Sequence, residues 1–422
     1  MKPTSSATKQ EQSSTPLRIV LCGGGTGGHV YPALAVAEAL QRKRPSARLL
    51  YLGGDRLEAR VVPAAGLPFR RLLVHGLTGR GFSRFFLRLR SAGELMLGIP
   101  LIQSLLALRR FQADVVVGTG GYVTGPVILA ARLLGIPSLT LVGDRTPGLT
   151  SKLVCRWVDI VAVGWSDQVR KLQQFARPQA RIVPTGLPIR HDLLSLSREE
   201  GAAAFGFDPN LTTLVMIGGS LGSLTMNEAL VGALRQLGRF DSRLKLVQVL
   251  HVAGGQPDRR VVLPTTEAEQ LCPRYQALPY LDRNYLHALA AADLVITRGG
   301  ASTVAEIAAR GLPAILIPWA KATTGEQVQN VEPLCNAGAA ILLLDRDLTP
   351  DSLASALRVL LWDRDRLQEM SHAARLLGKP HAADDVAELA LELAEAKALR
   401  RTARAPGAAG RRRGPDRGAT PD

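Results

Sequence analysis

Cysteine is scarce in this chain, with only four in 422 residues: Cys22, Cys155, Cys272 and Cys335. No two of them form a C-x-x-C pair, which argues against a zinc site or a dithiol motif. They are also too few and too scattered for the disulfide framework of a small secreted protein. We therefore expect reduced thiols in a cytoplasmic protein, with no metal site.

Long apolar runs are missing as well. No stretch approaches the roughly 18 residues that a membrane-spanning helix requires. Residues 1–16 are polar and lack the apolar segment of a signal peptide, so we expect a disordered leader there. The composition, 46% hydrophobic and 21% charged, is that of a globular protein with room for two domains and tails.

Aromatic residues make up only 5% of the chain, yet three of the nine phenylalanines fall within five positions. This short segment carries Phe82, Arg84, Phe85, Phe86 and Arg88. Rings interleaved with arginines are typical of a surface that enters a lipid boundary and meets anionic head groups. An amphipathic helix packed on a sheet would give the same spacing, and this alternative stays open.

Positive charge is concentrated in two places. Of the net charge of +16, most comes from residues 70–90, with six arginines and no acid, and residues 400–422, with seven arginines and two aspartates. A local basic patch indicates an anionic partner. Because no nucleic-acid-binding module is recognisable, we expect an anionic membrane surface and no nucleic acid. The Gly-, Ala-, Pro- and Arg-rich tail is expected to be disordered.

Apolar runs alternate with helical periodicities through most of the chain, which predicts a parallel α/β architecture. The predicted strands are 17–22, 48–52, 114–117, 137–142, 159–163, 181–183, 212–217, 245–252, 293–296 and 313–317. Helices are predicted at 98–111, 224–237, 302–310 and over most of 351–400. A strand leads into a glycine loop in each half, so we expect two Rossmann-like domains joined near 188–196. Their ligand would bind in the cleft between them, beyond the strands' carboxyl ends.

The first glycine loop, Gly23-Gly24-Gly25-Thr26-Gly27-Gly28-His29, lies between a strand and a helix. This geometry presents backbone amides and a positive helix end to a phosphate or a sugar. The loop also satisfies G-x-G-x-x-G, which suggests a nicotinamide-dependent oxidoreductase, although the nearest acid, Asp55, comes late for a ribose contact. A helix start favours a neutral imidazole, so His29 is a candidate base.

Three further motifs follow predicted strands: residues 118–126, residues 218–222 and residues 298–306. Each can present backbone amides to a ligand, while tight turns or helix caps are the simpler alternatives. In the last motif, Thr303 and Glu306 have capping-box spacing, but Glu306 could equally accept hydrogen bonds from a ribose. Arg190, at the predicted junction of the domains, is suited to a pyrophosphate.

Taken in this order and spacing, the four motifs, together with Gln327 and Asn330, resemble the MurG family of bacterial peptidoglycan synthesis over residues 17–393. The resemblance implies a GT-B fold whose last helix returns to the first domain. It also implies an inverting, metal-independent transfer of N-acetylglucosamine from UDP-GlcNAc to lipid I, the undecaprenyl-pyrophosphoryl-MurNAc-pentapeptide, giving lipid II. No cofactor is implied. The family lies peripherally on the cytoplasmic side of the cell membrane.

The resemblance also implies roles for individual residues. The donor would be bound by Thr26, Gly27, Gly28, Arg190, Ser220, Leu281 (through its backbone), Ala301, Ser302, Thr303, Glu306 and Gln327. The acceptor would be bound by Gly118, Gly120, Gly121 and Tyr122. His29 is the first candidate for the catalytic base and Asp144 is the second. The Phe/Arg segment, residues 82–88, would meet the membrane.

With this resemblance, five parts of the chain are expected. They are a disordered leader (1–16), an N-terminal acceptor and membrane domain (17–190), a C-terminal UDP-sugar domain (191–370), helices returning to the first domain (371–398) and a disordered Arg-rich tail (399–422).

The chain departs from the family pattern around the donor sugar. Asp144 replaces the usual Asn, Leu221 the usual Gln and Glu326 the usual His. Two further alternatives therefore stay open beside the oxidoreductase: a related GT-B enzyme acting on another membrane lipid, and a non-catalytic, membrane-associated protein that binds a UDP-sugar.

Overall fold

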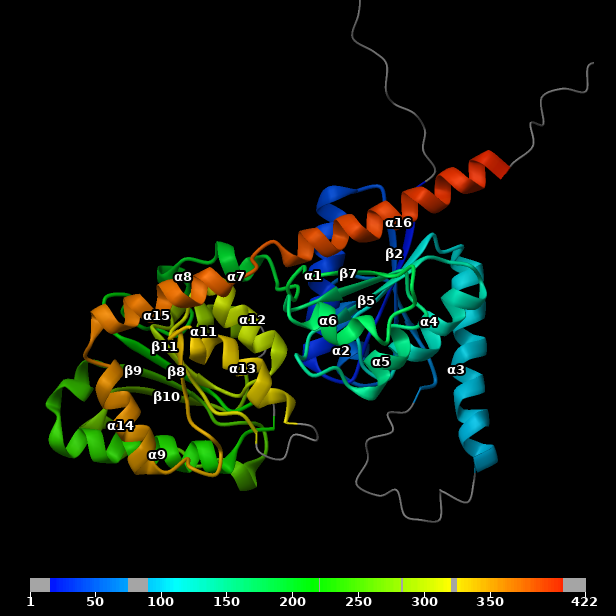
Figure 1. Cartoon of the computed structure of the whole chain (residues 1–422). Helices are drawn as coiled ribbons and strands as arrows, with labels where there is room; N and C mark the ends of the chain where they lie inside the picture. The colour runs from blue at the N-terminus through cyan, green and yellow to red at the C-terminus, as the bar shows by residue number, and fades with distance from the viewer. Residues whose placement is uncertain (1–15, 75–89, 220, 282–283, 320–324, 405–422) are drawn as a thin grey trace, which may run out of the picture.

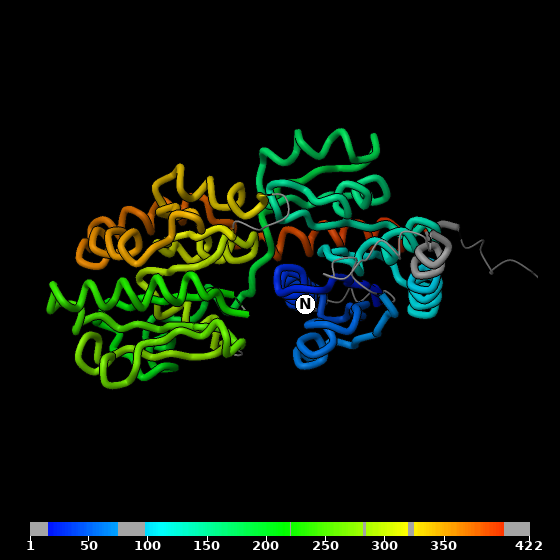
Figure 2. The backbone as a smooth tube through the Cα atoms, turned by 90° about the horizontal axis from the view of Figure 1, so that it is seen from below, coloured from blue at the N-terminus to red at the C-terminus, as the bar shows by residue number. Residues whose placement is uncertain are grey.

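The computed structural model describes residues 16–74, 90–219, 221–281, 284–319 and 325–404. It contains two lobes that lie side by side, each a parallel sheet with helices around it (Figures 1 and 2). The predicted membrane residues Phe82, Arg84, Phe85, Phe86 and Arg88, and the donor residue Ser220, lie outside the described residues.

The first domain is built on a seven-stranded sheet in the order β3-β2-β1-β4-β5-β6-β7. Its strands are β1 (Arg18–Cys22), β2 (Arg48–Gly53), β3 (Phe69–Arg71), β4 (Val115–Gly118), β5 (Ser138–Val142), β6 (Ile160–Val163) and β7 (Arg181–Val183). Its helices are α1 (Gly27–Lys43), α2 (Leu57–Ala64), α3 (Arg90–Phe111), α4 (Thr124–Leu133), α5 (Leu149–Val154) and α6 (Gln168–Gln173).

The second domain is built on a six-stranded sheet in the order β10-β9-β8-β11-β12-β13. Its strands are β8 (Thr213–Ile217), β9 (Gln248–Val252), β10 (Arg274–Leu278), β11 (Leu294–Thr297), β12 (Ala314–Leu316) and β13 (Ala340–Leu342). Its α-helices are α7 (Asp192–Ser195), α8 (Arg198–Ala203), α9 (Leu224–Phe240), α10 (Thr265–Leu271), α11 (Tyr285–Ala291), α12 (Ala301–Arg310), α13 (Glu326–Asn336), α14 (Pro350–Leu360) and α15 (Arg364–Leu377).

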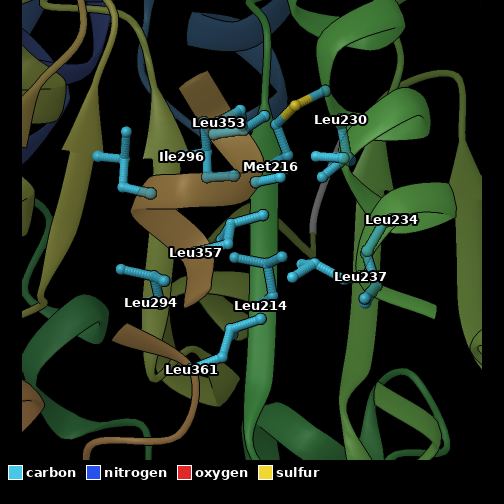
Figure 3. Close-up of a cluster of buried hydrophobic side chains, with 14 of the residues drawn as sticks. Leu214, Met216, Leu230, Leu234, Leu237, Leu294, Ile296, Leu353, Leu357 and Leu361 are labelled. Atoms are coloured by element: carbon cyan, nitrogen blue, oxygen red, sulfur yellow. The ribbon is translucent and has the colours of Figure 1, made fainter. Parts of the chain in front are cut away.

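Both sheets are buried on two faces, which explains why their central strands are continuous apolar runs. In β1, Ile19 and Leu21 join one hydrophobic cluster while Val20 and Cys22 join the other, because successive side chains point to opposite faces. In the second domain, β8 and β11 pack against α9 and α14 through a cluster that includes Leu214, Leu230, Ile296 and Leu353 (Figure 3).

The strand order places the glycine motifs. In each sheet the chain builds outward from one central strand and then continues on that strand's other side, so the switch points lie between β1 and β4 and between β8 and β11. The four motifs follow these four strands. Ligands of open parallel sheets bind at such positions. The topology therefore gathers the four motifs into two pairs.

Three strands escaped prediction: β3, β10 and β13. Each is the outer strand at an edge of its sheet and is only partly buried, so it lacks the continuous apolar run by which a central strand is recognised. The predicted strand 245–252 was too long, because residues Ser242–Leu246 form a 3-10 helix before β9.

The C-terminal helix α16 (Ala382–Arg404) leaves the second domain and lies along the first (Figures 1 and 2). Val386, Ala387 and Ala390 join the core beneath α1. At the rim, Arg42 pairs with Asp384 at 3.0 Å. The helix thus ties the two domains together. Among the described residues, no helix is both long and apolar enough to cross a lipid bilayer.

Candidate active site at the domain interface

Two helices begin at the domain interface without a side-chain cap. The N-cap of α1 is Thr26, whose side chain makes no capping bond, and the N-cap of α12 is Gly300, which has no side chain. Some helices elsewhere are capped by a side chain, such as α9 by Ser223 and α14 by Thr349, while several others, like α1 and α12, are not. The first-turn amides of α1 and α12 therefore face no side-chain acceptor at their caps, as an anion-binding helix end requires.

The two uncapped helix starts meet. Pro32, inside α1, has no N–H to donate to the carbonyl of Gly28, four residues earlier. That carbonyl instead accepts a hydrogen bond from the Ser302 hydroxyl of α12 at 3.3 Å. The predicted donor residues Gly28 and Ser302 thus lie in contact across the interface.

His29, in the first turn of α1, is held in a defined tautomer. Its Nδ1 lies 3.1 Å from the carbonyl oxygen of Thr119. A carbonyl can only accept, so Nδ1 carries the proton and Nε2 is left as the basic nitrogen. Burial lowers the pKa of His29, while the nearby carboxylates of Asp144 and Glu58 and the Thr119 carbonyl act in the opposite direction. The result is a neutral imidazole suited to accept a proton.

Gly120 and Gly121 make room for this histidine. Both have positive φ, 103° and 78°, which favours glycine. A Cβ at Gly120 would lie 2.6 Å from His29 Nδ1, and one at Gly121 would lie 2.0 Å from the carbonyl oxygen of Gly24. The loop after β4 therefore packs directly on the loop after β1, and its glycines already have a structural reason to be there.

A buried carboxylate behind these loops was not predicted from the sequence. Glu58, near the start of α2, is fully buried and accepts hydrogen bonds from Gly25 N at 3.0 Å, Gly54 N at 3.1 Å and the Tyr122 hydroxyl at 2.8 Å. Burial and this contact raise the pKa of Tyr122. The one available signal was the Gly53-Gly54 pair at the end of β2, where side chains would collide with Glu58.

Arg190 and Glu306 meet at the start of the second domain. Arg190 Nη2 lies 3.4 Å from Glu306 Oε1, and the Tyr285 hydroxyl donates to Glu306 Oε2 at 2.7 Å. The guanidinium lies over the rings of Tyr31 and Tyr285, at 4.5 and 5.1 Å from their centroids. Burial raises the pKa of Glu306, against the effect of Arg190.

This arrangement excludes one of the two interpretations of Glu306. The capping box with Thr303 is wrong, because α12 begins at Ala301 with Gly300 as its N-cap and Thr303 lies inside the helix. Glu306 is instead a buried acceptor in a cluster with Arg190 and Tyr285. Arg190 Nε is buried without a hydrogen-bond partner, so the cluster retains an unused donor.

Asp144 is held across the interface. Its Oδ1 accepts a hydrogen bond from the Asn330 side chain of α13 at 3.0 Å, and the Asn330 amide oxygen accepts from Arg145 N at 2.9 Å. Arg145 also pairs with Asp167 of the first domain at 2.8 Å and Glu332 of the second at 3.0 Å. These bonds connect the domains beside the site.

The other predicted residues are less strongly engaged. Gln327 accepts a hydrogen bond from Trp319 N at 2.9 Å, and the Leu281 side chain is buried in the core of the second domain. Gly118 must be small because a Cβ there would meet Thr124. Asp55, the acid that a dinucleotide-binding loop would need, pairs instead with Arg71 at 3.1 Å.

The chain matches two known family domains. Residues 19–163 match the glycosyltransferase family 28 N-terminal domain, and residues 213–386 match the family 28 C-terminal domain. The two matches cover both sheets' central strands and all four glycine motifs, two in each match.

Curated relatives extend the likeness to about nine-tenths of the chain. The UDP-N-acetylglucosamine--N-acetylmuramyl-(pentapeptide) pyrophosphoryl-undecaprenol N-acetylglucosamine transferase of Desulforudis audaxviator is 38% identical over 382 residues, which cover 90% of this chain and 99% of that protein. The protein of the same name from Halothermothrix orenii is 38% identical over 378 residues, 88% of this chain and 98% of its own.

A solved structure agrees. The crystal structure of Acinetobacter baumannii MurG superposes with a TM-score of 0.65 at 28% identity, covering 89% of this chain and 100% of that one. The chain therefore belongs to glycosyltransferase family 28 and, within it, to the MurG family of N-acetylglucosamine transferases.

Proposed function

We propose that this chain transfers N-acetylglucosamine from UDP-GlcNAc to lipid I, giving lipid II. The observation that carries the proposal is the meeting of two uncapped helix starts, α1 and α12, beside a histidine whose Nε2 is the basic nitrogen. Such a pair can bind a diphosphate and activate a hydroxyl in one place. The names of the relatives supply the two substrates.

The donor would lie mainly against the second domain. The α12 start, Ala301 to Thr303, and Ser220 would bind the pyrophosphate, and the free Nε of Arg190 would donate to it. Glu306, already an acceptor for Tyr285 and Arg190, would take the ribose hydroxyls. The Leu281 backbone would meet uracil, Gln327 the sugar hydroxyls, and Thr26 to Gly28 the sugar and phosphates.

The acceptor would approach from the first domain, past the loop that contains Gly118, Gly120, Gly121 and Tyr122. His29 Nε2 takes the proton of the acceptor hydroxyl as its oxygen attacks the anomeric carbon. The bond from that carbon to the UDP oxygen breaks, and the configuration inverts. Helix dipoles and Arg190 stabilise the departing diphosphate. Asp144, bonded to Asn330, would act by stabilising the imidazolium rather than as the base.

The two domains are bonded to each other beside the proposed donor site: Ser302 donates to the Gly28 carbonyl, and Asn330 bonds Asp144 and Arg145. Admission of the donor would therefore require the domains to part. Opening would break the contacts of Arg145 and Ser302 across the interface, and donor contacts would replace them on closure.

A membrane-facing surface would bring the enzyme to its lipid acceptor. Four apolar side chains are exposed on or beside α3: Leu73, Ile99, Ile102 and Leu106. Three of them recur at helical spacing on one face, and α3 follows directly after the Phe/Arg segment 82–88. We expect this surface to bind anionic lipid at the cytoplasmic side of the cell membrane.

The test of the proposed reaction uses the full chain, UDP-GlcNAc labelled in the sugar, and a lipid I analogue. We expect label in the lipid fraction and one UDP released per sugar transferred. UDP binding without transfer to this acceptor would overturn the proposal: transfer to another lipid would then identify a different acceptor, and transfer to none a binding protein. Sedimentation with phosphatidylglycerol vesicles, against phosphatidylcholine vesicles as control, tests the membrane surface.

A further inference from the structure

Glu58 is a buried carboxylate that has no role in the reaction proposed above. It is fully buried, and the three groups of the described residues that donate hydrogen bonds to it are all neutral: two backbone amides and one phenol. Burying a carboxylate costs free energy unless hydrogen bonds or a partner charge compensate it. The carbonyl oxygen of a neutral glutamine could accept hydrogen bonds from two of these donors at a lower desolvation cost. The use of a glutamate at this position therefore needs an explanation.

The contacts of Glu58 join three loops. Its Oε2 holds Gly25, in the loop before α1, while Oε1 holds Gly54, after β2, and Tyr122, after β4. The neighbouring glycines are shaped around it: a Cβ on Gly24 would lie 2.4 Å from Oε1, and one on Gly53 would lie 2.9 Å from its Cγ. His29 rests between two of these loops, bonded to Thr119.

We propose that Glu58 is a positioning residue for the transfer reaction, which fixes the loops around His29 and places a carboxylate near the imidazole. This inference rests on the proposed function, because it assumes that His29 is the base. When His29 accepts a proton, a nearby carboxylate that is itself buried and immobile stabilises the imidazolium without any reorganisation.

The effect of Glu58 on the pKa of His29 can be separated from the effects of the other groups around the imidazole. Asp144, bonded to Asn330, supplies a larger attraction to the imidazolium than Glu58 does, and the Thr119 carbonyl holds Nδ1. Tyr122 is a neutral phenol with the Arg56 guanidinium 5.1 Å from its ring centroid. The α12 side contributes the uncharged hydroxyl of Ser302. Removing the Glu58 charge therefore leaves Asp144 in place and should shift the His29 titration only in part.

Three variants distinguish charge from position. Glu58→Gln keeps the shape and removes the charge; Glu58→Asp keeps the charge and shortens the reach. Tyr122→Phe removes one contact while keeping the carboxylate. Glu38→Gln, on the exposed face of α1 in a pair with Arg42, is the matched control. Thermal unfolding of each variant, and UDP binding by calorimetry, establishes that it is folded.

The first measurement is the kinetics of transfer from UDP-GlcNAc to the lipid I analogue. For Glu58→Gln we expect kcat to fall on the order of 10²-fold, the effect of a small misplacement at a reacting centre, with little change in the KM for UDP-GlcNAc. The acid limb of its pH profile should move to lower pH, because the imidazolium has lost a stabilising charge. Glu58→Asp should lose kcat while its acid limb stays near that of the wild type.

The second measurement does not depend on the reaction. The pKa of His29 is followed by NMR, with His29→Gln used to assign its resonance among the seven histidines. We expect a lower pKa in Glu58→Gln than in the wild type and the Glu38→Gln control. An unchanged His29 pKa together with wild-type kcat would overturn the role of Glu58. A lowered pKa without any sugar transfer by the wild type would instead overturn the proposed function alone.

If both Glu58 variants fail to fold, Tyr122→Phe carries the test. It should lower kcat by less than Glu58→Gln, since two of the three contacts remain. Wild-type kcat in that variant would count against the link between the two loops.

Discussion

The two domains support their glycine loops with different chemistry. In the first, the charged carboxylate of Glu58 lies behind the loops. In the second, a neutral network takes the corresponding place: the His251 ring on β9 contacts the Tyr275 hydroxyl at 2.7 Å and the Asn227 side chain on α9 at 2.9 Å, and Asn227 donates to the Ala253 carbonyl.

The difference matches what each domain would bind. A fixed negative charge favours a histidine that must become an imidazolium, but it would repel a diphosphate. We infer that the first domain handles the proton and adds the α1 start to the diphosphate site, while the second domain supplies most of the donor contacts. The cluster around Arg190 is consistent with this division. Its carboxylate, Glu306, is paired with the Arg190 guanidinium and accepts a hydrogen bond from the Tyr285 hydroxyl.

The largest effect should come from the first domain's base. His29→Ala is expected to lower kcat about 10²- to 10⁴-fold, the range for losing a general base, with little change in the KM for UDP-GlcNAc. Single-turnover transfer of labelled sugar measures it. His372→Ala, an exposed position on α15, is the control. Near-normal turnover in His29→Ala would contradict the claim that the first domain supplies the catalytic base.

The second domain should respond in affinity rather than in rate. Glu306→Ala removes the ribose acceptor and leaves Arg190 and Tyr285 without their partner. Hydrogen bonds to a charged group contribute about 1.5–3 kcal/mol, so we expect UDP to bind on the order of 10- to 100-fold more weakly. Calorimetry with UDP measures this, with Glu267→Ala as a surface control. A loss confined to kcat would contradict the division of roles.

The neutral network should make the second domain sensitive to acid. Burial lowers the pKa of His251 from 6.5 to about 4. Between these values the unfolded chain binds more protons, so this contribution is fully present above pH 6.5 and is lost as the pH falls toward 4. From pH 7.5 to 5.0 the loss is about 2 kcal/mol.

Urea unfolding at the two pH values measures this loss. In His251→Gln the midpoint should depend less on pH, although the variant should be less stable at pH 7.5 because Tyr275 and Asn227 lose contacts. An equally steep pH dependence in His251→Gln would show that other groups cause it, such as His29, whose pKa burial also lowers.

The smallest effect should come from the link between the domains. Arg145→Ala removes ion pairs with Asp167 and Glu332 that are partly exposed. We therefore expect the free energy of domain closure to become less favourable by only about 0.5–1 kcal/mol. Small-angle scattering should show this as a modest increase in the radius of gyration. Arg366→Ala, which removes an exposed pair within α15, should leave the radius unchanged. An unchanged radius in Arg145→Ala would mean that α16 and the remaining interface bonds, such as those of Ser302 and Asp144, hold the domains closed.

Much of the fold was predictable because central parallel strands are buried on both faces. The runs at β1, β4, β8 and β11 were recognised from their apolar character. Three of the four edge strands, β3, β10 and β13, were not, since a short or partly buried strand lacks a continuous apolar run. Likewise Glu306 was recognised as a candidate, but its partner Tyr285 was not, because a hydrogen bond between residues 21 positions apart leaves no local pattern.

The sequence by itself determined the class of fold, the four glycine motifs and the family, because these depend on short-range patterns: apolar runs, glycine spacing and helix starts. Only the tertiary structure decided what lies behind and between the motifs. The burial of Glu58, the tautomer of His29 and the bond from Asp144 to Asn330 each depend on groups distant in the chain. Charge and burial act through space, so their consequences appear only once the chain has folded.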